Sequence, residues 1–281
     1  MGVARIEERF HALAKAGRAG FIPFITAGDP NRDLSLQILK ALPSAGADLI
    51  EIGMPFSDPM ADGPAVQASS LRALKAQMTL QGALDLVAAF RKEDSKTPII
   101  LMGYCNPIFT FGAERFAKAA ATAGADGLII VDLPPEEETE VKPFADAASL
   151  ALIRLVAPTT DDARLARVIQ GTSGFVYFIS ITGVTGTKSF SVNDIMPALE
   201  RLRRATNLPR AVGFGIKTPD HAADVARFAE AVVVGSAIVE EIGRGTSPAG
   251  IPREGLKDSV LSLVSSLSAA VHTARQKMDA R

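Results

Sequence analysis

Eight short runs of consecutive apolar residues recur along the chain, and Gly, Pro or Asp bounds each one. Because the apolar residues do not alternate with polar ones, both faces of each predicted strand should be buried, as in a parallel sheet covered by helices. Leu34, Ile38 and Leu42 repeat with helical spacing between two runs, and Thr218-Pro219 is typical of a helix start. The predicted strands are residues 21–27, 48–53, 98–104, 126–132, 150–156, 174–180, 210–215 and 231–235.

Two joints between a predicted helix and a predicted strand repeat each other. Ala45-Gly-Ala-Asp48 and Ala123-Gly-Ala-Asp126 each lead through a glycine into a buried run. Eight strand–helix units in 281 residues predict an α/β fold, a (β/α)8 TIM barrel forming a single domain over residues 1–281. An extra N-terminal helix near residues 5–15 and a C-terminal helix within residues 253–277 should flank it. An open doubly wound sheet is the alternative, but no G-x-G-x-x-G follows the first predicted strand.

Composition excludes several classes of protein. Thirty basic and thirty-one acidic residues leave a formal net charge of −1, whereas nucleic acid and anionic membranes both require a basic surface. Cys105 is the only cysteine, so a disulfide framework and a cysteine metal cluster are excluded, and no other ligand cluster predicts a metal. No apolar run is long enough to span a bilayer, and the N-terminus lacks the features of a signal or transit peptide. We expect a cytoplasmic protein.

Glycine-rich segments follow three of the predicted strands, at the end where TIM barrels place their active sites. These segments are residues 182–189, 213–216 and 235–239. Glycine lets backbone N–H groups approach an anion closely, and a helix N-terminus favours negative charge. The first segment resembles a nucleotide P-loop only superficially, because its glycine and lysine spacing differs. The glycines could serve turns alone, but three adjacent segments favour a phosphate site.

Glu51 is the most informative single residue, because it lies inside a buried run. Burial raises the pKa of a carboxyl group, which suits a residue that both gives and takes a proton near neutral pH. A structural salt bridge is the alternative. Asp58 and Asp62 follow in a turn-rich loop, and spacing does not choose between them. Tyr177 either packs or lines a pocket. No lysine lies inside a predicted strand, which disfavours a Schiff-base aldolase.

The segment from Glu51 to Pro64, EIGMPFSDPMADGP, resembles the signature of the tryptophan synthase alpha chain family. The resemblance implies reversible cleavage of indole-3-glycerol phosphate to indole and glyceraldehyde 3-phosphate, a carbon–carbon lyase reaction of tryptophan biosynthesis. It implies no cofactor in this chain, and a pyridoxal-phosphate-bearing beta chain as partner in an assembly of two alpha and two beta chains. The resemblance continues through residues 23–30, 101–107, 131–134, 180–186, 213–216 and 235–239.

The resemblance implies that Glu51 and Asp62 are the catalytic pair. Breaking the carbon–carbon bond requires protonation of indole C3, so the ring nitrogen develops positive charge. An Asp62 carboxylate would stabilise that charge, while Glu51 would transfer protons. Other implied substrate-binding residues are Phe24, Met102, Ile129 and Phe214 around the indole, Tyr177 beside the substrate, and Gly186, Gly215, Gly235 and Ser236 at the phosphate.

Residues 182–192 are predicted to form a mobile lid. The segment is long for a βα loop, where about 2–6 residues are usual, and few of its residues would anchor it to a core. Thr185 and Gly186 would contact the substrate phosphate and the Asp62 loop, and trypsin should cleave rapidly after Lys188 in the free chain. An ordered connection is the alternative.

Three functional alternatives stay open from the sequence. A stand-alone indole-3-glycerol-phosphate lyase would keep the chemistry without a beta chain. A different barrel phosphate-sugar isomerase would keep only the phosphate site. A non-catalytic activating subunit would need neither Glu51 nor Asp62.

Overall fold

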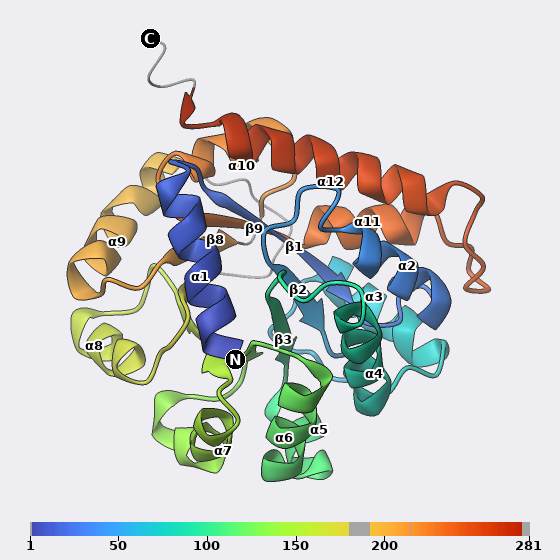
Figure 1. The fold of residues 1–281 in the computed structure, drawn as a ribbon, viewed down its shortest axis with the longest axis horizontal. Coiled ribbons are helices and arrows are strands. Elements are labelled where there is room, and N and C mark those ends of the chain that lie inside the picture. Colours follow the sequence, from blue (N-terminus) through green and yellow to red (C-terminus); the bar gives the residue numbers. More distant parts are fainter. Residues whose placement is uncertain (1, 180–191, 214, 277–281) are drawn as a thin grey trace.

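The computed structural model of this protein describes residues 2–179, 192–213 and 215–276. Parallel strands form one sheet in the order β5-β4-β3-β2-β1-β9-β8-β7-β6, and helices surround it (Figure 1). This is the predicted TIM barrel. The strands are β1 Gly20–Thr26, β2 Ile50–Gly53, β3 Ile99–Gly103, β4 Gly127–Ile130, β5 Ala151–Leu152, β6 Arg154–Val156, β7 Val176–Ile179, β8 Arg210–Gly213 and β9 Ala231–Val234.

The helices follow the strands along the chain, as the repeated strand–helix units predict. Thr218 caps α10, with Pro219 in its first turn. The helices are α1 Gly2–Lys15, α2 Arg32–Ala41, α3 Pro64–Lys75, α4 Leu80–Arg91, α5 Cys105–Phe111, α6 Ala113–Ala123, the 3-10 helix η1 Pro135–Glu140, α7 Lys142–Ala147, α8 Asp162–Gln170, α9 Val192–Ala205, α10 Pro219–Ala226, α11 Ser236–Arg244 and α12 Leu256–Thr273.

The predicted strand over residues 150–156 is in fact two short strands. β5 pairs with β4, whereas β6 pairs with β7, and Ile153 separates them. The Ile153 N–H still donates to the Leu128 carbonyl at 2.9 Å, so the chain changes hydrogen-bonding neighbour at this residue. The barrel closes through this single segment, which is why the eight predicted strands become nine.

Two apolar layers form the core. One lies between the strands and the surrounding helices, and the other fills the barrel interior. Helix α1 crosses one end of the barrel (Figure 1), where the Phe10 ring packs on the Phe175 ring with centroids 5.6 Å apart. Helix α12 lies within the predicted range and begins after Gly255, whose φ of 74° is left-handed. These are the two extra helices that the sequence predicts.

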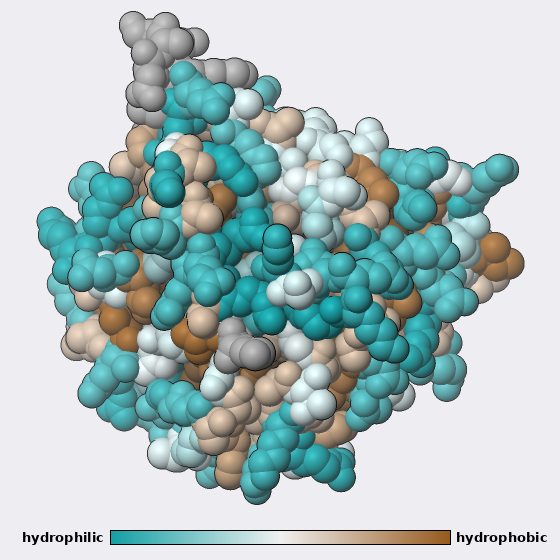
Figure 2. All heavy atoms as spheres, viewed as in Figure 1, coloured by the Kyte–Doolittle hydropathy of each residue, from teal (hydrophilic) through white to brown (hydrophobic). Residues whose placement is uncertain are grey.

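The surface on the α1 side is mostly hydrophilic, with small hydrophobic areas scattered between hydrophilic residues (Figure 2). None of the described helices combines the length and the apolar character needed to cross a bilayer.

Candidate active site

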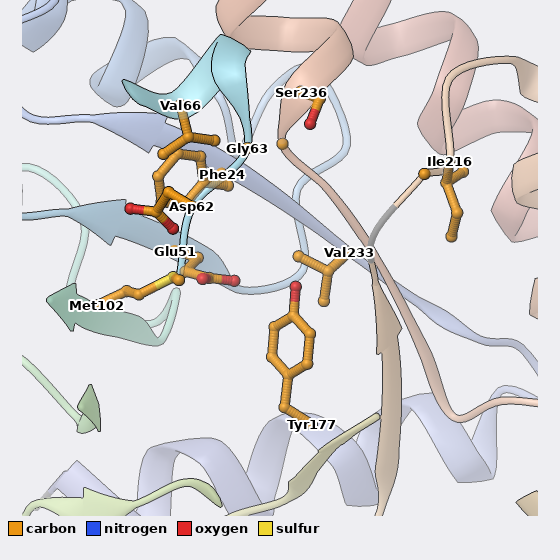
Figure 3. Close-up of a pocket in the computed structure, with 12 residues that line it drawn as sticks. Phe24, Glu51, Asp62, Gly63, Val66, Met102, Tyr177, Ile216, Val233 and Ser236 are labelled. Atoms are coloured by element: carbon orange, nitrogen blue, oxygen red, sulfur yellow. The ribbon is translucent and has the colours of Figure 1, made fainter. Parts of the chain in front are cut away.

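A pocket opens at the C-terminal ends of the strands, where barrel enzymes place their chemistry. It brings together side chains from β1, β2, β3, β7 and β9 with the first turns of α3 and α11 (Figure 3). Its lining contains most of the described residues that the sequence nominates. The lining residues are Phe24, Glu51, Asp62, Gly63, Val66, Met102, Tyr177, Gly215, Ile216, Val233, Gly235 and Ser236.

Glu51 lies on β2 with its side chain toward the barrel interior. Its register partners are Phe24 on β1 and Ile100 on β3, and both belong to the apolar cluster that fills the barrel interior. Only 2% of the Glu51 surface is exposed. Burial raises its pKa to about 8, and the negative charge of Asp62 adds to the rise. Within the described part of the chain, no cation pairs with Glu51. The structural salt bridge that the sequence left open is therefore not seen among these residues.

Asp62 and Asp58 have different surroundings, although they share one loop. Asp62 lines the pocket, and burial raises its pKa to about 6. Asp58 is exposed and accepts a hydrogen bond from the neighbouring Ser57 hydroxyl. The Asp62 carbonyl also accepts a bond of 2.9 Å from the Gln67 amide on α3. Only Asp62 is therefore placed to act on a molecule in the pocket.

Tyr104 holds the Asp62 loop, and sequence reasoning assigned it no role. It follows β3 directly and is 3% exposed. Its hydroxyl accepts a bond of 3.1 Å from the Ala61 N–H and donates one to the Asp62 carboxylate, which opposes the rise in the pKa of Asp62. Its ring packs on Phe56 with centroids 5.4 Å apart. Tyr104 therefore fixes both the backbone and the carboxylate of this loop.

Tyr177 stands upright in the pocket, with its hydroxyl directed toward the same central space as the Glu51 carboxyl group (Figure 3). A Cβ atom at Gly213 would lie only 2.2 Å from this hydroxyl, so position 213 must lack a side chain. Burial raises the pKa of Tyr177 far above its usual range, and the charges of Glu51 and Asp62 add to the rise. Tyr177 therefore stays protonated and can donate a hydrogen bond.

The opposite end of the pocket is built from a helix N-terminus. Gly235 is the N-cap of α11, and Ser236 is its first residue. The first N–H groups of a helix have no partner within it and carry partial positive charge, so they suit a phosphate. Gly215, with a φ of 76°, adds a left-handed turn beside them.

Four predicted residues lie elsewhere or outside the described residues. Ile129 pairs with Met102 in register but is fully buried and is not part of the lining. Thr185, Gly186 and Phe214 lie outside the described residues, as does most of the predicted lid, including Lys188.

Four further residues line the pocket and were not predicted as site residues, namely Gly63, Val66, Ile216 and Val233. Val233 is the third residue of β9, and Ile216 is the last residue of the glycine-rich segment 213–216, so their positions near strand ends offered a weak signal for both. Val66 lies on α3, and only the folded chain places that helix at the pocket.

Two carboxyl groups of raised pKa and a helix N-terminus line one pocket at the C-terminal rim of a closed barrel. This arrangement is typical of enzymes that transfer protons on an anionic ligand. No group of three or more His, Cys, Asp or Glu that could hold a metal ion occurs among the described residues.

Comparison with known proteins then identifies the family. Residues 10–266 match the family model described as tryptophan synthase alpha chain. The tryptophan synthase alpha chain of Caulobacter vibrioides is 57% identical over 271 residues, covering 96% of this chain and 97% of that one. The Phenylobacterium zucineum protein is 55% identical over the full length of both chains. A crystal structure of the Legionella pneumophila alpha chain has a TM-score of 0.85 and 36% identity, covering 95% and 97%.

The chain belongs to the tryptophan synthase alpha chain family. Membership confirms the lyase activity that the resemblance implied, cleavage of indole-3-glycerol phosphate in tryptophan biosynthesis. It also favours the alpha-subunit role over the alternatives.

Proposed function

We propose that Glu51 and Asp62 catalyse this cleavage together, with the N-terminus of α11 holding the substrate phosphate. The observation that carries the proposal is the Glu51 carboxyl group, which is buried among apolar side chains and faces a second carboxyl group. A pKa near 8 keeps Glu51 mostly protonated at neutral pH, whereas a pKa near 6 leaves Asp62 mostly ionised. One pocket therefore holds an acid and a carboxylate at the same time.

The two roles follow from these protonation states. Glu51 donates its proton to C3 of the indole ring, and the Asp62 carboxylate stabilises the positive charge that develops at the ring N–H. The Glu51 carboxylate then accepts the proton of the hydroxyl on the adjacent side-chain carbon while the carbon–carbon bond breaks. The electron pair of that bond returns to the ring, which releases indole and glyceraldehyde 3-phosphate and leaves Glu51 protonated again. Tyr177 and Phe24 would orient the substrate.

Glu51→Gln tests the proposal. The amide keeps the size of the side chain and cannot transfer a proton, so release of glyceraldehyde 3-phosphate should fall about 10²–10⁴-fold. Binding of glycerol 3-phosphate should persist. Asp58→Asn is the matched control, because it neutralises an exposed carboxylate next to the same pocket. Turnover of Glu51→Gln close to that of the control would assign Glu51 a structural role.

We further propose that residues 1–281 act as one domain in the cytoplasm, without a cofactor of their own, and bind a pyridoxal-phosphate-bearing beta chain in an assembly of two alpha and two beta chains. Two large apolar side chains at the pocket end of the barrel support a protein partner there. Met60, in the Asp62 loop, is 87% exposed, and Phe109, on α5, is 45% exposed. Exposed apolar surface of this kind suits a protein interface.

Substitution at these two positions tests the docking site. The double variant Met60→Asp/Phe109→Asp should lower affinity for the beta chain at least about tenfold, because it buries charge at the interface. Ile251→Asp, at an apolar residue that is 66% exposed in the connection between α11 and α12, should leave affinity unchanged. Sedimentation of mixtures measures both. Equal affinity for the two variants would mean that the beta chain docks elsewhere, and no binding by the wild-type chain would favour a stand-alone lyase.

A further inference from the structure

Arg72 connects three walls of the pocket, although it does not line the pocket itself. Its side chain projects from α3, the helix that begins directly after Asp62 and Gly63. Its Nε and Nη2 atoms donate to the two carboxylate oxygens of Asp29, each at 2.7 Å. Asp29 is 1% exposed and lies just beyond β1, the strand that carries Phe24. This planar two-point pairing fixes orientation as well as distance.

The same guanidinium also reaches α11. Its Nη2 atom donates to the Val239 carbonyl at 3.1 Å, one turn beyond the N-terminus of that helix. A Cβ atom at Gly243 would lie 2.9 Å from Nη1, so α11 presents bare backbone to the guanidinium one turn further on. Helices α3 and α11 also pack directly against each other, and Arg72 adds to this packing a hydrogen bond of fixed direction between them.

A second link holds α3 to β1. The Ser69 hydroxyl on α3 and the Thr26 hydroxyl at the end of β1 are hydrogen-bonded at 2.6 Å, and both residues are fully or almost fully buried. With this link in place, removing the contacts of Arg72 leaves α3 attached to β1, while the hydrogen bond from α3 to α11 is lost.

We propose that Arg72 is a positioning residue that sets the distance between the phosphate-binding end of α11 and the Asp62 end of α3. This inference rests on the proposed function, since a substrate that joins an indole to a phosphate must contact both ends at once. A fixed spacing favours the joined ligand beyond what each part gains alone. If the Arg72–Asp29 pair only stabilised the fold, its loss would weaken binding of the spanning ligand and of the separate fragments to the same extent.

The test compares fragments with a ligand that spans the pocket. We would measure dissociation constants for indole, for glycerol 3-phosphate, and for an indole joined to phosphate by a three-carbon chain. In Arg72→Lys, one nitrogen replaces the planar fork that holds Asp29 and Val239 together. Each fragment should bind within about twofold of wild type, whereas the spanning ligand should bind about tenfold or more weakly.

Arg210→Lys is the matched control. Arg210 is 9% exposed and pairs with Glu230 through Nε at 2.6 Å, but it begins β8 at the opposite end of the barrel. It should lower thermal stability by a similar amount and leave the ratio of spanning-ligand to fragment affinities unchanged. The same change of ratio in both variants, or in neither, would overturn the proposal.

A second variant covers the case in which Arg72→Lys does not fold. The double variant Asp29→Asn/Arg72→Gln removes both charges, so no buried charge is left unpaired. Its affinity for the spanning ligand should fall as it does in Arg72→Lys. A wild-type ratio in this variant contradicts the role of Arg72. Failure of the proposed function is separate: glycerol 3-phosphate would then bind Ser236→Asp as tightly as wild type.

Discussion

Glu51 and Asp62 share one pocket but titrate in different ranges of pH. The proposed mechanism needs Asp62 ionised and Glu51 protonated. The value of kcat/KM should therefore rise as Asp62 loses its proton near pH 6 and fall as Glu51 loses its own near pH 8. We expect a bell-shaped profile with its maximum between these values, measured by release of glyceraldehyde 3-phosphate. Asp58→Asn should leave the profile unchanged. A profile without a limb near pH 8 would contradict the role given to Glu51.

Removing the Tyr104 hydroxyl should move one limb of that profile. The hydroxyl donates to the charged form of Asp62 and so opposes the rise in its pKa. In Tyr104→Phe the pKa of Asp62 should therefore increase, the acidic limb should shift to higher pH, and the alkaline limb should stay in place. Kinetics over both limbs check this expectation. An unshifted acidic limb, with lower activity at every pH, would mean that Tyr104 only holds the Ala61 backbone.

Among single residues, the sequence identifies those that are unusual among their immediate neighbours in the chain. Glu51 is one of these, because burying a carboxyl group in an apolar run is energetically costly. Tyr104 and Arg72 do not stand out, since each acts through a partner 43 residues away in the chain. Spacing also did not separate Asp58 from Asp62, because exposure, which distinguishes them, depends on how the loop folds against Tyr104.

At the scale of secondary-structure elements, an added negative charge can test whether the N-terminus of α11 binds phosphate. Ser236→Asp should weaken binding of glycerol 3-phosphate about tenfold or more, because the added carboxylate occupies the partial positive charge that the phosphate would use. Binding of indole should not change, and the helix should remain folded, since an acidic residue is favourable at this position. Ser236→Asn is the neutral control. Calorimetry with each ligand separates the outcomes, and equal losses for indole and glycerol 3-phosphate would contradict the assignment.

Position 236 is a better choice than position 235 for this experiment. A Cβ atom at Gly235 would approach Phe24 at 3.2 Å, so a substitution there would disturb the phosphate end and the apolar wall together.

The strands were predictable as elements because each is a continuous apolar run, and all eight runs form strands. Their pairing partners were not equally predictable. Residues 150–156 read as one strand, yet Ile153 marks a change of neighbour from β4 to β7. Local composition reports burial, whereas hydrogen-bond partners depend on how the whole ring of strands closes.

For the whole molecule, Asp48 is a buried junction whose contribution to stability depends on pH. Burial acts to raise its pKa, but hydrogen bonds from His272, Arg18 and the Phe21 N–H outweigh this and lower the pKa from 3.8 to about 2. A lowered pKa means that the ionised form stabilises the folded state above about pH 4, and that this contribution is lost as pH falls toward 2.

Asp48→Asn should therefore lower the free energy of unfolding by about 2 kcal/mol at neutral pH. The difference from wild type should shrink progressively below pH 4. Asp146→Asn, which breaks an exposed pair with Lys142, should cost less than about 1 kcal/mol. Urea unfolding across this range of pH measures all three proteins. A difference that does not vary with pH would mean that the Asp48 charge contributes nothing.

The barrel as a whole follows from the number and type of its units. Eight buried runs alternating with helices leave few ways to cover every strand on both faces, and closing the sheet is one of them. The sequence did not reveal how the flanking helices attach. Helix α12 reaches Asp48 through His272, whose Nε2 lies 2.8 Å from the carboxylate, and no pattern near either residue predicts that contact.

That contact has a consequence for synthesis of the chain. Asp48 and its partners Arg18 and Phe21 leave the ribosome early, but His272 follows Asp48 by 224 residues. At 5–20 residues per second, roughly 11–45 s pass between the two. During that interval the Asp48 junction is incomplete, and the apolar face of α12 does not yet cover the first helices and strands. The nascent barrel must therefore keep an unfinished surface out of aggregates until α12 with His272 has left the ribosome, and only then can the folding of the Asp48 junction be completed.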